Sequence, residues 1–161
     1  MRNKKKILVC GGTGFIGRNI VEYFSKLINY EVHATHYKRN KFGNNKIKWH
    51  KVDLRNKNRV NKIIKNFDIV FQAAATTSGA RDIVNKPYIH VTDNAVMNSL
   101  LLREAFEQSV GHFVFPSCTI MYQKSPTALK ETDFDPADDL LPFYFGAGHT
   151  KIYLERMCEF Y

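Results

Sequence analysis

Short apolar runs alternate along the chain with segments in which apolar residues recur every three or four positions. An apolar run of about four to eight residues that stops at glycine or polar residues is typical of a buried strand, and the wider spacing is typical of one face of a helix. The pattern predicts five strands, at residues 6–10, 31–37, 47–52, 68–73 and 112–116. It predicts four helices, at residues 15–24, 57–67, 93–109 and 150–160. Because strands and helices alternate, we expect an α/β fold with a doubly wound parallel sheet of the Rossmann type and helices on both faces.

The length and composition allow one such sheet and little more. The chain has 161 residues, of which 44 % are hydrophobic, which suffices for one core. We therefore expect residues 1–161 to form a single domain. The longest apolar runs, such as 7–10 and 113–116, fall far short of the roughly 20 residues that cross a bilayer, so no membrane partner is expected.

Cysteine usage and the N-terminus favour a cytoplasmic protein. The cysteines Cys10, Cys118 and Cys158 are far apart, odd in number and without C-x-x-C spacing, so they predict neither a disulfide framework nor a zinc site. The basic residues 1–6 precede an apolar run of only 7–10, which is too short for a secretory signal. The six histidines lack the spacing of metal ligands, so no metal is expected.

The net charge raises the question of a nucleic-acid partner. The formal charge is +9, with 24 Lys and Arg against 15 Asp and Glu. A strongly basic domain can bind nucleic acid. Here the cations are spread along the chain among asparagines, and no nucleic-acid-binding motif accompanies them. We therefore expect no nucleic-acid partner.

The strongest motif is rich in glycine and joins the first predicted strand to the first predicted helix. It fits both G-x-G-x-x-G and G-x-x-G-x-x-G, and its residues are Gly11, Gly12, Thr13, Gly14, Phe15, Ile16 and Gly17. At such a junction glycines allow a tight turn, close approach of the backbone to a pyrophosphate, and close packing of the helix on the strand. We interpret the segment as a dinucleotide-binding turn.

The end of the second predicted strand bears on which nicotinamide nucleotide binds. An acidic residue about 20 positions past the glycines holds the ribose 2′-hydroxyl of NAD. Here the strand ends in basic residues, His36, Lys38 and Arg39, and the nearest acid, Glu31, lies at its start. Cations at this point suit a 2′-phosphate, which favours NADP over NAD. The alternative is a solvated loop in a lysine-rich protein.

Together these segments resemble the extended short-chain dehydrogenase/reductase family of nucleotide-sugar epimerases, dehydratases and reductases. The resemblance covers nearly the whole chain and rests on residues 11–17, 53–54, 73–75, 117–122, 131 and 148–151. It implies hydride transfer between NAD(P) and a sugar carbon of a nucleotide-sugar substrate. It also implies that residues 1–161 are the cofactor half, since the family holds its substrate with a region that follows the last helix seen here.

The resemblance implies roles for individual residues. Asp53 and Leu54 would border the adenine, and Lys151 would hold the nicotinamide ribose and lower the pKa of a catalytic phenol. The cofactor cleft would be lined by Ala73, Ala74 and Ala75. The family's asparagine in the long helix falls on Ala95, beside Asn94, and no role is carried over there. The family often pairs through two helices, which implies a homodimer formed by residues 93–109 and 150–161. The alternative is that the apolar residues of these helices only cover the sheet.

The chain departs from the family at the phenol that transfers a proton. The family places a tyrosine four residues before the lysine, on the same face of the helix, and this chain has Ala147 there. Ala147 cannot transfer a proton. Tyr144 lies seven residues before Lys151, about 10 Å along a helix axis, so it could replace the phenol only where that segment is not helical.

A second departure concerns the hydroxyl group of the family's catalytic serine or threonine. Cys118 occupies that position, and a thiol is a poorer hydrogen-bond donor than a hydroxyl, which Ser117 or Thr119 could supply if the turn shifts by one residue. Cys118 is either an activated nucleophile or a buried thiol without a role. These departures leave two interpretations, an enzyme that uses another proton donor and a non-catalytic module that binds NADP.

Overall fold

The computed structural model describes residues 4–43, 45–137 and 139–161. Met1–Asn3, which hold part of the basic N-terminal segment, lie outside the described residues. The chain divides into two compact units. The first comprises residues 1–75, 97–116 and 161, and the second comprises residues 76–96 and 117–160.

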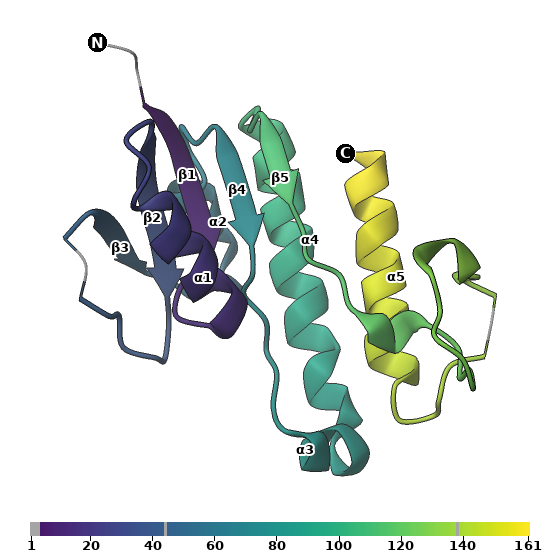
Figure 1. The fold of residues 1–161 in the computed structure, drawn as a ribbon. Coiled ribbons are helices and arrows are strands. Elements are labelled where there is room, and N and C mark those ends of the chain that lie inside the picture. The colour runs from purple at the N-terminus through teal and green to yellow at the C-terminus, as the bar shows by residue number, and fades with distance from the viewer. Residues whose placement is uncertain (1–3, 44, 138) are drawn as a thin grey trace. The chain divides into compact units, whose positions relative to one another are not determined.

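The first unit is built on a five-stranded sheet in which all paired strands are parallel (Figure 1). Its strands are β1 (Lys5–Cys10), β2 (Tyr30–His36), β3 (Ile47–Lys51), β4 (Ile69–Gln72) and β5 (His112–Val114). Their order in the sheet is β3-β2-β1-β4-β5, so the chain starts at the centre and winds outward in both directions. The predicted doubly wound Rossmann-type sheet is confirmed, and no strand end differs from its predicted position by more than two residues.

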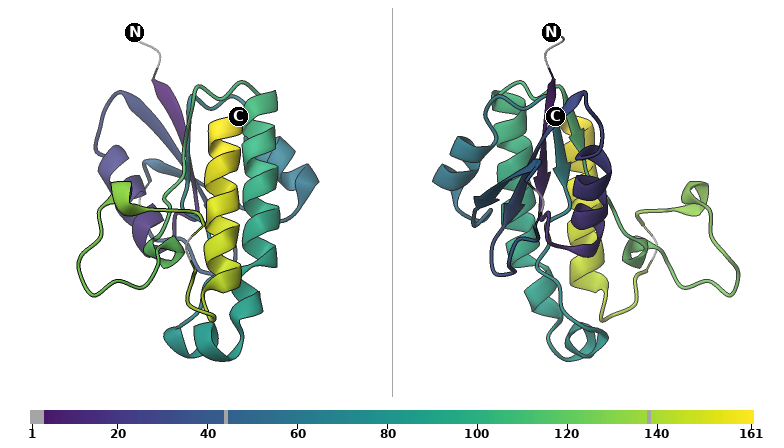
Figure 2. Two further views of the ribbon diagram at one scale, coloured as in Figure 1. Left: turned by 90° about the vertical axis from the view of Figure 1, so that its right-hand side faces the viewer. Right: turned by 60° about the vertical axis from the view of Figure 1, so that its left-hand side comes forward.

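Helices cover both faces of this sheet, because apolar residues alternate between the faces along each strand (Figure 2). The helix α1 (Phe15–Phe24) places Val21 against Ile7 and Val9 on one face. The opposite face packs against α2 (Lys57–Ile63) and the part of α4 (Thr92–Glu107) that belongs to this unit. The core residues on that face include Leu8, Cys10, Val60, Val70 and Leu101.

The helix α2 is shorter than the predicted 57–67. It starts after Asn56, whose side chain accepts a hydrogen bond from the Arg59 main-chain amide at 3.1 Å. Such a cap satisfies one of the unpaired amides of the first turn. The helix ends at Ile63, and Asn66 adopts a left-handed conformation with φ of 64°. Because a left-handed residue cannot continue a right-handed helix, the apolar periodicity outlasts the helix itself.

Among the described residues, the second unit contains two α-helices of its own and three short 3₁₀ segments. The helices are α3 (Ala80–Asn85) and α5 (Phe145–Phe160), and the 3₁₀ segments are η1 (Pro87–His90), η2 (Thr119–Met121) and η3 (Glu131–Asp133). The helix α5 begins five residues before the predicted 150. A Cβ on Gly148 would lie 2.5 Å from Leu140 Cδ1, so this glycine lets α5 pack closely within the unit. Packing therefore outweighs the low helix propensity of glycine.

Membrane-spanning helices, metal-binding groups and disulfides are absent from the described ranges. No helix there is long and apolar enough to cross a membrane. No group of three or more histidine, cysteine or acidic side chains in those ranges could hold a metal ion. The cysteines Cys10, Cys118 and Cys158 are all free.

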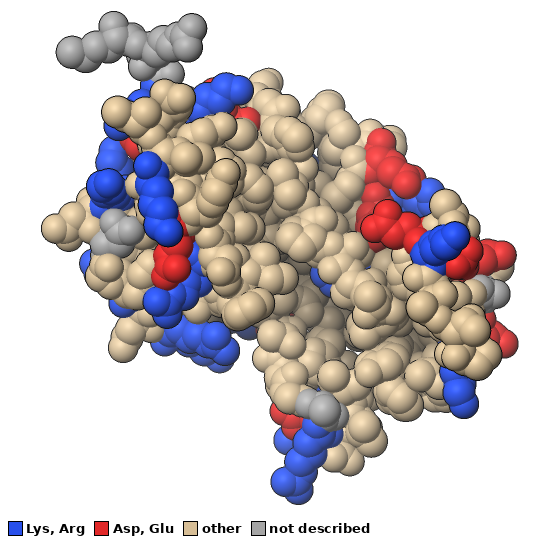
Figure 3. All heavy atoms as spheres, viewed as in Figure 1, with Lys and Arg blue, Asp and Glu red and all other residues tan. Residues whose placement is uncertain are grey.

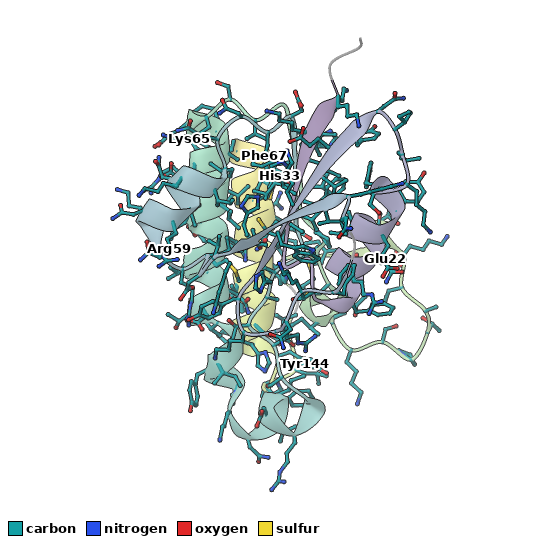
Figure 4. All side chains as sticks on the ribbon, turned by 90° about the vertical axis from the view of Figure 1, so that its left-hand side faces the viewer. Glu22, His33, Arg59, Lys65, Phe67 and Tyr144 are labelled. Carbon is teal, nitrogen blue, oxygen red and sulfur yellow. The ribbon has the colours of Figure 1, made fainter. Side chains whose placement is uncertain are left out.

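A pair of stacked histidines lies on the β2 and β3 strands. His33 Nδ1 and His50 Nε2 share a hydrogen bond of 2.9 Å, and His33 Nε2 lies 2.8 Å from Glu31 Oε1. The ring of Phe67 packs edge-on against His33, with centroids 4.8 Å apart (Figure 4). Burial, together with the charges of His33 and Lys48, lowers the pKa of His50 from 6.5. Hydrogen bonds from His33 and Lys48 lower the pKa of Glu31 from 4.5 to about 2.

We expect this cluster to make the fold sensitive to acid. The unfolded chain binds a proton at His50 near pH 6.5, before the folded chain does, so the free energy of unfolding falls as the pH drops below that value. Glu31 adds a second loss as the pH falls from 4.5 towards 2. Urea unfolding midpoints at pH 7.5, 6 and 5 should decrease in that order.

Two variants test whether His50 causes the loss of stability between pH 6.5 and 5. In His50→Gln the decrease between pH 6.5 and 5 should become smaller, because the group that titrates has been removed. His112→Gln removes an exposed histidine of β5 and should leave the wild-type pH profile unchanged. Identical profiles for the wild type and His50→Gln would show that His50 is not the source.

Candidate functional site

The turn between β1 and α1 is held by its own main chain and by Thr35 of β2. The amide of Gly11 donates to Thr35 Oγ1 and the amide of Gly12 donates to the Thr35 carbonyl, both at 2.9 Å. The amide of Gly14 donates to the Gly11 carbonyl at 2.9 Å. Gly11 has φ of +76°, a conformation that side chains other than glycine rarely adopt. The turn is therefore fixed before any ligand arrives.

Three of the glycines are required by packing. A Cβ on Gly11 would lie 2.6 Å from the Cα of Ala74, and a Cβ on Gly12 would lie 2.7 Å from the Cβ of Ala34. A Cβ on Gly17 would overlap the carbonyl oxygen of Gly11. These contacts bring α1, β2 and the end of β4 close to the turn.

Gly14 is different, because neither its backbone nor its neighbours require glycine. Its φ of −79° and ψ of 169° suit any residue, and a Cβ there would approach only the Gly11 carbonyl oxygen, at 3.3 Å. Gly14 is the N-cap of α1, makes no side-chain cap, and is followed by a first turn without acidic residues. A helix N-terminus of this kind favours an anion, through its amides and its dipole. Beside it, Phe15 is 86 % exposed and Ile16 is 50 % exposed.

Small residues that follow β4 lie beside the glycine turn. The amide of Ala73 donates to the Cys10 carbonyl at 3.1 Å, which extends the pairing of β1 and β4. The side chain of Gln72 donates to the Ala74 carbonyl at 3.0 Å and accepts from the Ala74 amide at 3.3 Å. Ala74 is thus held against Gly11, and Ala75 follows it. The structure brings these predicted cleft residues to the glycine turn.

The basic residues after β2 lie at the same edge of the sheet, because β1 and β2 are parallel neighbours. His36 is the last residue of β2, and its Nδ1–H donates to the Arg39 carbonyl at 3.1 Å. The side chains of Lys38 and Arg39 are exposed. Figure 3 shows that Lys and Arg side chains gather on the viewed face over the β3 edge of the first unit.

A charged cluster that sequence reasoning missed follows β3. The Asp53 carboxylate accepts hydrogen bonds from Arg55 Nε at 2.9 Å, from Arg55 Nη2 at 2.8 Å and from the Arg55 amide at 3.0 Å. These bonds, with one from the Tyr37 hydroxyl, lower the pKa of Asp53 to about 2. Leu54 is 5 % exposed and belongs to the core, so its side chain is not open to a ligand. The signal that could have revealed Arg55 is an Asp-x-Arg sequence directly after a strand.

In the second unit, Cys118 and Lys151 lie close enough that each shifts the pKa of the other. Burial raises the pKa of the Cys118 thiol, and the charge of Lys151 opposes this rise only in part. Burial also lowers the pKa of Lys151. A thiol with a raised pKa stays protonated, so the structure does not favour Cys118 as an activated nucleophile. It does place the thiol close enough to Lys151 for the two groups to interact electrostatically.

Thr119 and Cys118 line a cavity of about 890 Å³ in the second unit. Thr119 is exposed and opens η2, and Cys118 precedes it as the N-cap. The polar and charged residues of the cavity wall include Gln123, Lys130, Glu131 and Glu155. Figure 3 shows acidic side chains gathered over the part of this unit that contains η3.

Tyr144 could replace the missing phenol only where its segment is not helical, and the structure shows a helical turn there. The Tyr144 carbonyl accepts the Gly148 amide at 2.7 Å, so the helical turn begins at Tyr144 itself. Lys151 therefore lies about two helical turns further on, roughly 10 Å along the axis. The ring of Tyr144, labelled in Figure 4, packs against Phe143 with centroids 4.5 Å apart. Ala147 and Lys151 are one turn apart within α5 and share a face.

Asn94, for which the family resemblance implies no role, ties two segments of the second unit together. Its Oδ1 accepts the Thr76 amide at 2.9 Å, and its Nδ2 donates to the Thr76 carbonyl at 2.9 Å and to the His90 carbonyl at 2.8 Å. The side chain is 9 % exposed. Buried asparagine with this many partners holds the segment after Ala75 against the start of α4.

Comparison with known proteins identifies the family. A sequence profile described as the NAD dependent epimerase/dehydratase family matches residues 7–161. The chain belongs to this family. It is 28 % identical over 169 residues to "UDP-glucose 4-epimerase 2" of Arabidopsis thaliana, an alignment that covers 96 % of this chain and 47 % of the relative. The chain therefore spans about half the length of that relative.

Solved structures of similar proteins agree with the fold. The "MlghC, GDP-mannoheptose C4 reductase from Campylobacter jejuni with NADP bound" is 25 % identical, with a TM-score of 0.77, over 100 % of this chain and 45 % of its own. A UDP-glucose 4-epimerase from Thermotoga maritima, determined with UDP-glucose, has 22 % identity and a TM-score of 0.77, over 96 % of this chain and 50 % of its own. These matches confirm the predicted fold, and the match to the family profile confirms the predicted family.

Proposed function

We propose that residues 1–161 form the cofactor-binding part of an NADP(H)-linked epimerase, dehydratase or reductase of nucleotide sugars. The nicotinamide nucleotide would lie with its pyrophosphate at the N-terminus of α1 and its adenosine at the ends of β2 and β3. The substrate class and the transfer of hydride at a sugar carbon come from family membership and from what the similar proteins are named for.

One observation carries the cofactor part of this proposal, namely the unexplained glycine at position 14. Gly11, Gly12 and Gly17 are needed by the fold, whereas Gly14 is not. A residue without a side chain at a helix N-cap lets the backbone approach a pyrophosphate closely. The absence of an acid at the end of β2, where His36 stands, favours the 2′-phosphate of NADP.

The roles proposed for other residues follow the family. Ala73, Ala74 and Ala75 would line the cleft, and Lys151 would hold the nicotinamide ribose. Thr119, the neighbour of Cys118, is the hydroxyl candidate, and Cys118 would contribute only a protonated thiol. That residues 1–161 act as one domain, and that they pair through the α4 and α5 helices, remain predictions.

A second candidate function is a module that binds NADP without turning over a substrate. The observation that favours it is Ala147, which stands on the lysine face of α5 where the family has its phenol, with Tyr144 about two turns from Lys151. Under this alternative the chain binds the cofactor as above, and no hydride is transferred between the cofactor and a substrate.

Calorimetric titration of the chain with NADPH and with NADH tests the proposal. We expect both to bind, with NADPH about tenfold tighter, because charge-assisted hydrogen bonds to a phosphate contribute about 1.5–3 kcal/mol each. The double substitution Lys38→Gln with Arg39→Gln should weaken NADPH and leave NADH nearly unchanged. Equal affinities for the two cofactors would contradict the NADP preference, and no binding of either would contradict the proposal itself.

A further inference from the structure

Arg55, which is bound to Asp53 and packs near Tyr37, has no role in the function proposed so far. We propose that Arg55 contributes more than Lys38 or Arg39 to distinguishing NADP(H) from NAD(H), by contacting the ribose 2′-phosphate, and that Asp53 and Tyr37 hold its guanidinium in place. The inference rests on the proposed cofactor function of the glycine turn.

The topology places the cluster where the adenosine end of the cofactor would lie. In the sheet, His36 of β2 pairs in register with Lys51 of β3, and both are the last residues of their strands. Tyr37 follows the first directly and Asp53 follows the second by two positions. In doubly wound folds the residue at the end of the second strand reads the ribose 2′ position. Arg55 therefore stands at the place where NAD and NADP differ.

Contacts from two sides fix the guanidinium of Arg55. Two of its nitrogens donate to the two carboxylate oxygens of Asp53, at 2.9 and 2.8 Å, in the paired geometry that carboxylates and phosphates share. Its central carbon lies 5.7 Å from the centroid of the Tyr37 ring. The side chain is still 37 % exposed, so its charge faces outward rather than into the core.

Asp53 is occupied in this arrangement and acts as a positioning residue. A carboxylate offers about four acceptor positions. Arg55 uses three of them through Nε, Nη2 and its amide, and the Tyr37 hydroxyl donates a fourth hydrogen bond. The acceptor positions of the carboxylate are therefore used by Arg55 and Tyr37. The guanidinium is the charged group of the cluster that a ligand would meet.

A fixed cation is a better phosphate contact than an exposed flexible one. Lys38 and Arg39 are exposed, and ordering such a long side chain on a ligand costs up to about 2 kcal/mol of conformational entropy. For Arg55 much of that cost is already met in the folded chain, because its contacts with Asp53 and Tyr37 restrict it. We therefore expect Arg55 to contribute more to 2′-phosphate affinity than either residue of the loop.

The test compares NADPH and NADH affinities of Arg55→Gln with those of the wild type by calorimetry. Arg55→Gln should weaken NADPH at least tenfold and leave NADH within twofold, so the ratio of the two affinities falls at least fivefold. Arg59→Gln is the matched control, since it removes the same charge from α2, where Arg59 is exposed and projects outward (Figure 4). It should leave the ratio unchanged. Thermal melts of each variant establish that the chain is folded.

The variant Asp53→Asn separates positioning from simple repulsion. If Asp53 only repelled the phosphate, removing its charge would tighten NADPH; if it positions Arg55, NADPH should weaken threefold or more with little effect on NADH. Tighter NADPH binding would overturn the role of Asp53. An unchanged NADPH to NADH ratio in Arg55→Gln, with both cofactors bound by the wild type, would overturn the inference alone. Failure of the wild type to bind either cofactor would overturn the inference and the proposed function together.

Discussion

Replacing Gly14 by aspartate should abolish NADPH binding while leaving the chain folded. The backbone of Gly14 is already extended, as an N-cap residue requires, and a Cβ there meets only the Gly11 carbonyl oxygen, at 3.3 Å. Aspartate is a favoured N-cap, because its carboxylate pairs with first-turn amides and with the positive end of the helix dipole. The same carboxylate would occupy the proposed anion site and repel a pyrophosphate. We expect NADPH affinity to fall at least about 100-fold, or roughly 3 kcal/mol.

The opposite behaviour is expected of Gly17→Ala, which serves as the contrast. Its Cβ would overlap the Gly11 carbonyl oxygen, so α1 must shift away from the turn and the melting temperature should fall by many degrees. Calorimetric titration with NADPH and thermal unfolding followed by circular dichroism measure both effects. NADPH binding within tenfold of the wild type in folded Gly14→Asp would show that the turn is not the pyrophosphate site.

The sheet could be predicted from the sequence because burial on both faces requires apolar residues along its central strands. β1 and β4 are apolar runs covered on both faces, and Val21 of α1 faces the sheet as helical spacing requires. Strands covered on both sides by helices have little freedom to be polar. The glycine turn was predictable for a similar reason, since Gly11, Gly12 and Gly17 are dictated by contacts that no other residue permits.

Two features depend on tertiary contacts that produce no recognisable pattern in the sequence. The early start of α5 depends on Gly148 packing against Leu140, whereas glycine in the sequence normally argues against a helix. The Arg55 cluster depends on Tyr37 and Asp53 leaving adjacent strands side by side, which strand order reveals and sequence spacing does not. For the same reason, the family's proton-transfer position could be located at Ala147, but the helical start at Tyr144 needed the structure.

Restoring the phenol by Ala147→Tyr should create an acidic tyrosine and raise turnover of a nucleotide sugar. Both Ala147 and Lys151 lie within α5, one turn apart, so the introduced hydroxyl shares a face with the ammonium. Lys151 is partly buried, which strengthens its effect on a neighbouring charge. An opposite charge at this range lowers a pKa by about 1–3 units, so the introduced phenol should titrate clearly below the ordinary value of about 10.

The phenol is measured as phenolate absorbance, taken as the difference between the titration of Ala147→Tyr and that of the wild type. The same variant with Lys151→Met in addition should titrate near the ordinary pKa, because the ammonium is gone. General acid–base groups contribute about 10²–10⁴-fold to rate. In a protein that joins residues 1–161 to a substrate-binding region of the family, reduction of a nucleotide 4-keto sugar by NADPH should therefore rise at least about tenfold where position 147 limits catalysis. A lowered pKa without any gain in turnover by that longer protein would favour the non-catalytic module, since the proton donor would then be present and still unused. An unshifted pKa would show that Lys151 does not act on this face of α5, which contradicts the role proposed for it.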